Sequence, residues 1–471
     1  MRIAIFGTGS GSKKFLKSID TEKLEIITYV DNNPQKIGQT KNGIAIVGPQ
    51  DLLELEFEYI IIASEYTTEI IQQLLFLGID LNKIIPFYLE GFLNQLKKDR
   101  EHFIGNVKLK MPIKTEKQII GLITKGYSGS NTYALYRNRP KYLEEKYDIE
   151  LIAIENFDRN KTYDLLCSTS IFSKYDNEII NVQLWHGFPL KKIGLRTELF
   201  EKSYNSDIRE KTDIITSYSE TYNTLFNASF PNESSKYQIT GMPRNDFLNT
   251  KNVKKIENFF GVNLEEKKII CYLPTYRKWV NDMSINGDRI WENIFGFKDY
   301  NLSDFINFLK TNKLFFICKL HQMEANKLDT SCYEPFKENI AFIQENDLVN
   351  KDIDLYELLA NIHVLITDYS SVYFDILLRE EIGIVFCPTD LKSYKENRGF
   401  NLEPYEFWTP GPKVFNQVEM QNEIIKSLQP NYYLNERNMI KSIVHKYNDF
   451  NSTERVWKLI DKVLTNKNLH I

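Results

Sequence analysis

Residues 362–378 read IHVLITDYSSVYFDILL, and this stretch is the most informative part of the chain. The mostly apolar run 362–366 has the composition of a buried strand, whereas residues 372–378 are apolar enough for a buried helix. Only a tight turn fits between them. The first N–H groups of such a helix have no partners inside it and favour a phosphate, although a serine there also suits an ordinary N-cap. The stretch therefore predicts a strand, a turn and a helix, with the turn either holding phosphate or capping the helix.

The composition is that of a globular protein with an ample core. The chain of 471 residues is 42% hydrophobic and 26% charged, enough for two or three domains. A net charge of −4 argues against a nucleic-acid partner. No stretch approaches the ~18 apolar residues of a membrane span, and the first strand breaks at Gly7 too early for a signal peptide. The five cysteines form no C-x-x-C pair, which favours reduced thiols in the cytoplasm and argues against a zinc site.

Residues 1–98 are predicted to form a small Rossmann-like α/β domain. Strands over 2–6, 26–30 and 59–63 are followed by a helix over 67–77. The sequence GTGSGS at 7–12 and an acid after the second strand match the dinucleotide fingerprint, except that Ser12 replaces its third glycine. A scaffold or docking domain is the alternative. The candidate nucleotide-binding residues are Gly7, Gly9, Gly11 and Asp31.

Residues 99–117 are interpreted as a basic linker. Lysines dominate this segment, so it is either a solvated connector or a contact with anionic lipid. Two further α/β units follow, over 118–245 and 246–471, in which strands alternate with helices at the spacing typical of parallel sheets. The last helices of the second unit can pack back on the first. Two such units in tandem leave a cleft, and ligands of parallel sheets bind at the carboxyl ends of the strands.

Four motifs in these two units could carry chemistry, and most of them follow a predicted strand. Histidine beside glycine can meet a ligand without a side-chain shield, and its pKa suits a general base. Guanidinium groups on rigid turns match phosphate, and a lysine next to a histidine adds positive charge. The alternatives are a structural histidine and salt-bridged arginines at turns. The motifs are WHGFPLKK at 185–192, GMPRND at 241–246, YLPTYR at 272–277 and CKLH at 318–321.

In this order and spacing, these motifs make residues 118–460 resemble the CDP-glycerol glycerophosphotransferase family, whose members build teichoic acids and related capsule polymers. The Gly-rich turn before Asn131, the TDYSS sequence at 367–371 and the SxER sequence at 452–455 complete the match. The resemblance implies a GT-B fold, in which two Rossmann-like domains face each other across a cleft. It also implies transfer of a polyol phosphate from a CDP-polyol to an acceptor hydroxyl, with release of CMP. The sequence YVDNNP at 29–34 resembles the Rossmann-like front domain of bacterial sugar acyltransferases.

The resemblance assigns roles to particular residues of this chain. His186 and His321 correspond to the family's two essential histidines, with His186 as the general base and His321 as an imidazolium. The 118–245 unit then holds the acceptor, through Ser130, Asn131 and Lys191. The 246–471 unit holds the CDP donor. The predicted donor-binding residues are Arg244, Pro274, Thr275, Arg277, Lys319, Thr367, Asp368, Ser370, Ser371 and Asp375.

Cationic side chains and the helix start can compensate the phosphoryl charge, so no metal and no cofactor is predicted. Three positions depart from the family pattern. Phe188 stands for a threonine, Gln322 for a proline and His363 for an aspartate. His363 is predicted to be structural, and His102, His445 and His470 to lie at the surface.

The predicted enzyme therefore uses CDP-glycerol, with CDP-ribitol next, and a lipid-linked, glycan or polyol-phosphate acceptor. We expect a cytoplasmic protein held peripherally on the inner, anionic face of the cell membrane. The sequence is compatible with a homo-oligomer. A GT-B glycosyltransferase using a nucleotide-sugar is the alternative enzyme. A nucleotide-binding regulatory or docking protein is the alternative outside catalysis.

Overall fold

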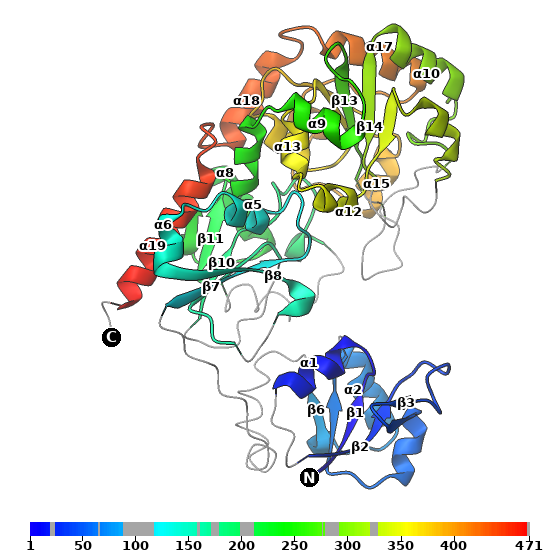
Figure 1. Ribbon diagram of the computed structural model, residues 1–471, viewed down its shortest axis with the longest axis vertical. Helices are drawn as coiled ribbons and strands as arrows, with labels where there is room; N and C mark the ends of the chain where they lie inside the picture. Colours follow the sequence, from blue (N-terminus) through cyan, green and yellow to red (C-terminus); the bar gives the residue numbers. More distant parts are fainter. Residues whose placement is uncertain are drawn as a thin grey trace. The chain divides into compact units, whose positions relative to one another are not determined.

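A computed structural model describes residues 1–18, 24–64, 66–87, 117–157, 161–170, 179–197, 212–275, 277, 292–320 and 328–468. The chain divides into two compact units. The first contains mainly the first 118 residues, and the second contains most of the chain from residue 119 onward. Each unit is built on parallel sheets (Figure 1). No helix in the part of the chain that the structure describes is both long and apolar enough to cross a bilayer.

The first unit carries a six-stranded sheet in the order β3-β4-β2-β1-β5-β6, parallel except for the β3–β4 hairpin. Alternating residues of β1 face two separate cores, with Ile3 and Ile5 on one side and Ala4 and Phe6 on the other. The predicted strands and helix are confirmed here to within one residue at each end. The elements are β1 (Arg2–Phe6), α1 (Ser10–Ser18), β2 (Glu25–Val30), β3 (Thr40–Lys41), β4 (Ile44–Val47), β5 (Tyr59–Ile62), α2 (Thr67–Phe76) and β6 (Ile84–Pro86).

The second unit holds two sheets. The first has the order β12-β11-β10-β9-β7-β8. Its elements are β7 (Gln118–Thr124), α5 (Asn131–Arg137), α6 (Tyr142–Lys146), β8 (Tyr147–Ala153), β9 (Leu165–Ser168), β10 (Ile180–Gln183), β11 (Ile214–Ser217), α8 (Glu220–Ser229), β12 (Tyr237–Ile239) and the 3-10 helix η6 (Pro243–Asn249).

The second sheet of this unit is parallel throughout, in the order β15-β14-β13-β16-β17. Its strands are β13 (Lys268–Leu273), β14 (Leu314–Cys318), β15 (Ile340–Phe342), β16 (Val364–Thr367) and β17 (Gly383–Phe386). Its helices are α9 (Val253–Phe260), α10 (Leu302–Thr311), α12 (Glu345–Asn350), α13 (Leu355–Leu359), α14 (Val372–Ile376), α15 (Leu391–Asn397), α16 (Tyr405–Trp408), α17 (Gln417–Ser427), α18 (Leu434–Val444) and α19 (Ser452–Asn468).

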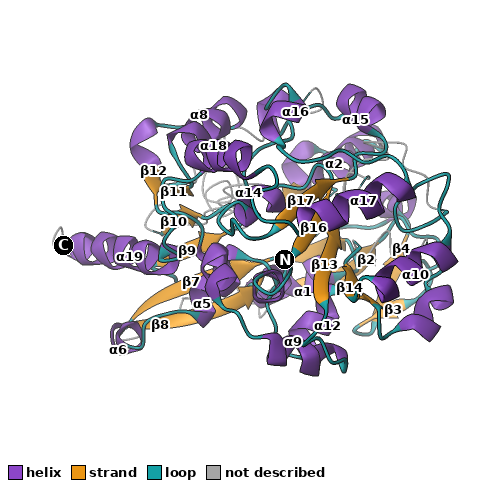
Figure 2. Ribbon diagram, turned by 90° about the horizontal axis from the view of Figure 1, so that it is seen from above, coloured by secondary structure: helices purple, strands orange, loops and turns teal. Residues whose placement is uncertain are grey.

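Helices cover both faces of this second sheet. Figure 2 shows β16 and β17 between α14 on one side and α10 and α17 on the other. Ile270 and Ile366 face a core shared with α10 and α17, whereas Cys271 and Leu365 face a core shared with α14 and α18. The second core continues into the first sheet's helices, because Trp185 and Phe226 belong to it.

The last helix, α19, packs on the first of these two sheets (Figure 1). Trp457 is fully buried there, and its indole N–H donates to the carbonyl of Leu135 at 3.0 Å. Lys146 of α6 pairs with Asp461 of α19 at 2.7 Å. The C-terminal end of the chain therefore stabilises the sheet that begins at residue 118. The proposed division of the chain at residue 245 stays a prediction.

Candidate active site

The site begins where β10 ends. Trp185 follows this strand with φ +50°, a left-handed backbone conformation that is rare for a bulky residue. Its backbone N–H is held by Gln183 Oε1 at 2.8 Å, and its ring packs edge-on against Phe226 at 5.0 Å. Backbone strain that packing maintains in this way is concentrated at functional sites. The strained residue directly precedes His186, whose ring stacks on the indole at 4.5 Å.

One hydrogen bond fixes the tautomer of His186. Its Nδ1 lies 2.8 Å from the carbonyl oxygen of Thr169. A carbonyl can only accept, so we assign the proton to Nδ1, which leaves Nε2 with a free lone pair. This backbone partner was not predictable from the sequence. The imidazole is therefore arranged as a base at Nε2.

The charge state of His186 follows from its surroundings. The side chain is exposed at the pocket, but many protein atoms lie around the imidazole and remove part of its water. This burial, together with the positive charges of Arg244, Lys191 and Lys125, lowers the pKa of His186 to about 4, although its bond to Thr169 opposes the shift. At neutral pH the ring is uncharged and able to accept a proton.

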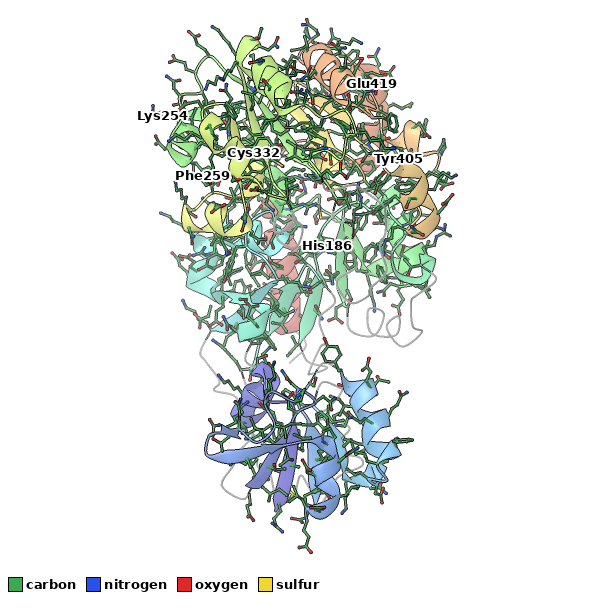
Figure 3. The ribbon with its side chains drawn as sticks, turned by 90° about the vertical axis from the view of Figure 1, so that its right-hand side faces the viewer. His186, Lys254, Phe259, Cys332, Tyr405 and Glu419 are labelled. Atoms are coloured by element: carbon green, nitrogen blue, oxygen red, sulfur yellow. The ribbon has the colours of Figure 1, made fainter. Side chains whose placement is uncertain are left out.

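His186 opens into a pocket of about 250 Å³ that both sheets' connections line. Figure 3 shows His186 where the two parts of the second unit meet. Six of the predicted site residues share this pocket. They are His186, Arg244, Pro274, Lys319, Ser370 and Ser371.

The two serines come from the turn that precedes α14. Ser371 occupies the N-cap position, but its hydroxyl makes no capping bond. Ser370 Oγ accepts only a long bond, 3.5 Å, from the N–H of Val372. Of the two alternatives for this turn, the capped helix start is therefore not what the structure shows. Both side chains line the pocket instead.

Gly187 sets how closely His186 approaches this serine turn. It has φ +152°, and a Cβ added there would overlap Ser371 Oγ. We expect Gly187→Ala to push the two segments apart and to lower turnover on the order of 10²-fold, the cost typical of a displacement of about 1 Å in an active site. Steady-state kinetics would measure this loss. Gly261→Ala is the matched control, because Gly261 also has a positive φ but nothing within 4 Å of an added Cβ. Equal rates for both variants would contradict the argument.

Arg244 braces the pocket wall. Its Nη2 pairs with Asp375 Oδ2 at 2.7 Å, and its Nη1 donates to the carbonyl oxygen of His186 at 3.0 Å. Asp375 is fully buried and also accepts from the hydroxyls of Tyr218 at 2.9 Å and Tyr356 at 2.6 Å. The predicted donor-binding pair thus ties the histidine turn to α14, and only Arg244 reaches the pocket.

Arg277 lies away from this pocket's lining. Its guanidinium binds Asp390 through two bonds of 2.7 and 2.8 Å and pairs with Asp368 at 2.8 Å. It also lies 4.9 Å from the centre of the Tyr369 ring. The side chain is only 3% exposed. In this structure Arg277 organises the turn after β16, and its predicted contact with the donor stays a prediction.

The other predicted residues outside the pocket hold the strand ends together. Thr275 donates its backbone N–H to Asp368 Oδ1 at 2.8 Å, and Thr367 Oγ1 donates to the carbonyl of Leu273 at 2.7 Å. These bonds connect the ends of β13 and β16. Thr275, Thr367 and Asp368 are therefore positioned to shape the turn that carries the serines.

Of the three acceptor candidates, Asn131 and Ser130 form hydrogen bonds within the protein, whereas Lys191 lies near other positive charges. Asn131 is fully buried, with its amide donating to Trp185 O at 2.9 Å and its oxygen accepting from Arg244 N at 3.2 Å, so it holds the His186 turn and η6 together. Ser130 Oγ pairs with Thr132 Oγ1 at 2.7 Å. Lys191 is half-buried, and burial followed by the charges of Arg398 and Arg277 lowers its pKa to about 8. Lys191 thus lies in a region of surplus positive charge.

The structure also shows where several other residues discussed in the sequence analysis lie. His445 was expected at the surface but is 8% exposed, because its Nε2 bonds Phe374 O at 2.8 Å. Phe188 is 2% exposed and packs on Phe374 at 4.8 Å in the aromatic core. His363 accepts the N–H of Ile269 at 3.0 Å. His321, Gln322, His102 and His470 lie outside the described residues.

The pocket also contains residues that the sequence did not single out as site residues. They are Ser128, Gly129, Leu273, Leu355, Tyr356 and Val372. Leu355 and Tyr356 belong to α13, whose start is marked by the capping box of Asp354 and Glu357. That box identifies a helix start but not its place at a pocket. Within the described ranges, no group of three or more His, Cys, Asp or Glu side chains could hold a metal ion.

Comparison with known proteins identifies the class. The model of the family described as CDP-Glycerol:Poly(glycerophosphate) glycerophosphotransferase matches residues 165–462, and the chain belongs to this family. It is accordingly a transferase, as the resemblance predicted. Residues 1–85 match a second model, described as C2185-like, N-terminal.

Two curated relatives and one solved structure illustrate the likeness. A teichoic acid glycerol-phosphate primase of Bacillus subtilis (strain 168) is 27% identical over 291 residues, 60% of this chain and 68% of the relative. A teichoic acid poly(glycerol phosphate) polymerase of Bacillus spizizenii W23 is 30% identical over 246 residues, 49% of this chain and 57% of the relative. The wall teichoic acid polymerase TagF superposes with a TM-score of 0.60 at 20% identity, covering 75% of this chain and 90% of that structure. The fold likeness to TagF confirms the predicted GT-B arrangement.

Proposed function

We propose that this chain transfers glycerol phosphate from CDP-glycerol to a hydroxyl group of a lipid-linked or glycan acceptor and releases CMP. The observation that supports it most is the free Nε2 of an uncharged His186 in a pocket shared with Ser370, Ser371 and Lys319. The matched primase and polymerase, whose names carry glycerol phosphate, favour glycerol over ribitol.

The chemistry assigns a step to each group. The acceptor oxygen attacks the phosphorus that carries glycerol, and its proton passes to Nε2 of His186. The bond from that phosphorus to the bridging oxygen breaks, and CMP leaves with the bond's electron pair. Lys319 and the serine hydroxyls at the pocket stabilise the negative charge on the transferring and leaving phosphates. Lys191, near Arg398 and Arg277, supplies further positive charge for a phosphate-bearing acceptor. This proposal requires no metal and no cofactor.

A donor comparison tests the proposal. The purified chain is incubated with CDP-glycerol, CDP-ribitol or a UDP-sugar, with and without a short lipid-linked glycerol-phosphate acceptor, and released nucleotide is measured. We expect acceptor-dependent release of CMP from CDP-glycerol. Release of CMP from CDP-ribitol alone would show that CDP-ribitol, and not CDP-glycerol, is the donor. Release from the nucleotide-sugar alone would establish the glycosyltransferase alternative, and absence of turnover with any donor would favour a regulatory or docking protein.

The acceptor's lipid anchor would bring the enzyme to the inner face of the cell membrane as a peripheral protein. The basic residues of the linker, which could contact anionic lipid, lie outside the described part of the chain except for Lys117. Flotation of the protein with vesicles of anionic and of neutral lipid would measure this attachment. Recovery that does not depend on anionic lipid would contradict it.

The lowered pKa of His186 predicts the pH profile. Only the neutral ring can accept the proton, and the neutral form is present above the ring's pKa. We therefore expect kcat/KM to lose nothing through His186 as pH falls from 8 to 6.5, and to decline through protonation of this ring only below pH 6.5, toward its pKa of about 4. Titration of the ring by NMR, assigned with a His186→Asn variant, would check the same value. An apparent pKa at or above 6.5 for this ring would contradict the prediction.

A further inference from the structure

The first unit contains a hollow of its own, with a volume of about 730 Å³. It is lined by residues that follow the carboxyl ends of β1, β2 and β5. In the strand order β4-β2-β1-β5, the chain runs from β1 through β2 to β4 on one side and then returns to β5 on the other side of β1. In parallel α/β sheets such a switch point is where ligands bind. All four predicted nucleotide candidates, Gly7, Gly9, Gly11 and Asp31, line this hollow.

The glycine-rich turn is shaped to bring backbone close to a ligand. Gly7 has φ +106°, and a Cβ there would come 2.8 Å from the carbonyl oxygen of Ala63, so only glycine lets the turn pass the end of β5. A Cβ at Gly9 would meet no atom within 4 Å. Helix α1 begins one residue later, and its first N–H groups have no partners inside the helix.

Positive charge converges on this turn. Lys36 Nζ bonds Thr8 Oγ1 at 3.0 Å and Asp31 at 2.9 Å, and Lys41 Nζ donates to the Thr8 carbonyl at 2.5 Å. Lys13 lies close enough that, after burial, its charge and that of Lys36 lower the pKa of Lys41. Of these three lysines Lys36 lines the hollow, whose lining also carries the carboxylates of Asp31 and Glu69. The lysines near the turn outnumber these two carboxylates, which suits an anionic ligand.

The carboxylate of Asp31 accepts hydrogen bonds from within the protein that the sequence did not indicate. Its carboxylate accepts from the backbone and hydroxyl of Thr8, from Lys36 and from the N–H of Asn33. In the dinucleotide fold the corresponding acid binds the ribose hydroxyls, and a carboxylate with four donors has little capacity left for them. Asp31 therefore fixes the turn, and the hollow departs from a site for NAD.

We infer that this hollow binds the phosphate groups of a mononucleotide, such as a nucleoside diphosphate or its ester, at the turn 9–11 and Lys36. The ring of Tyr66, 71% exposed and part of the lining, offers a flat surface for the base. This second site does not depend on the proposed transferase chemistry. Its ligand can be the donor itself or a different nucleotide.

Calorimetry on the full chain tests this inference, with CDP-glycerol, CDP, UDP, ADP, NAD and inorganic pyrophosphate as probes. Gly9→Asp places a carboxylate in the open space above the turn, and Lys36→Ala removes the half-buried cation of the lining. We expect each to weaken nucleotide binding at one site at least tenfold while CMP release in the transfer assay stays unchanged. Gln72→Glu is the matched control, since it adds the same charge on the exposed side of α2 away from the hollow.

The binding data distinguish a mononucleotide site from a docking domain and from a site for NAD. A mononucleotide site that Gly9→Asp removes and Gln72→Glu retains supports the inference, whether or not the transferase proves active. Identical affinities and stoichiometries in the wild type and Gly9→Asp would overturn it in favour of a docking domain. Tighter binding of NAD than of any mononucleotide would also overturn it, because that result requires an available Asp31.

Discussion

Replacing His186 by alanine is expected to slow transfer from CDP-glycerol by about 10²–10⁴-fold, the range that general-base catalysis typically contributes. The loss follows because no other imidazole among the described pocket-lining residues could accept the acceptor's proton. Donor affinity is expected to remain within about threefold of wild type, since the serine turn and Lys319 are untouched. Single-turnover kinetics and donor binding, measured on the same preparation, separate the two effects.

His363→Gln is the matched control for this experiment. His363 precedes β16, at the opposite end of the strand from the serine turn, and lines a different hollow. Its removal is expected to change the transfer rate less than twofold. A His186→Ala enzyme that turns over at the wild-type rate would remove His186 from the mechanism. Loss of donor binding together with turnover would show that the histidine holds the donor and is not only a base.

The arrangement of the pocket was largely predictable because parallel strands end at one edge of a sheet. β16 lies at residues 364–367, as its apolar run predicted, and the motifs at 185–192, 272–277, 318–321 and 367–371 each follow a strand. That rule brings together Pro274, Lys319 and Ser371, which follow strands of one sheet. His186 follows a strand of the other sheet, and it joins them because the two sheets face each other across a cleft, as the family resemblance implied. The same rule predicted the hollow of the first unit.

What the sequence could not predict depends on partners distant along the chain. The carbonyl of Thr169 fixes the tautomer of His186. Because every residue has a backbone carbonyl, the sequence could not single out this one. His445 follows a polar segment, but the aromatic core that encloses it is assembled from α8 and α14. Arg277 has the same motif context whether it binds phosphate or carboxylates, and only Asp390, 113 residues later, decides which is present in this structure.

Arg277→Leu is expected to lower the free energy of unfolding of the second unit by about 3–5 kcal/mol, the usual cost of removing one partner from a buried ion pair. Asp368 and Asp390, both at most 6% exposed, would be left without their counter-charge. Urea unfolding followed by tryptophan fluorescence measures this unit selectively, because all five tryptophans lie after residue 118. Adding Asp390→Asn to Arg277→Leu is expected to recover part of the stability, since it removes one unpaired charge. If Arg277→Leu instead keeps the wild-type stability within ~1 kcal/mol and loses affinity for CDP-glycerol, then Arg277 binds the donor and the buried network is not its main role.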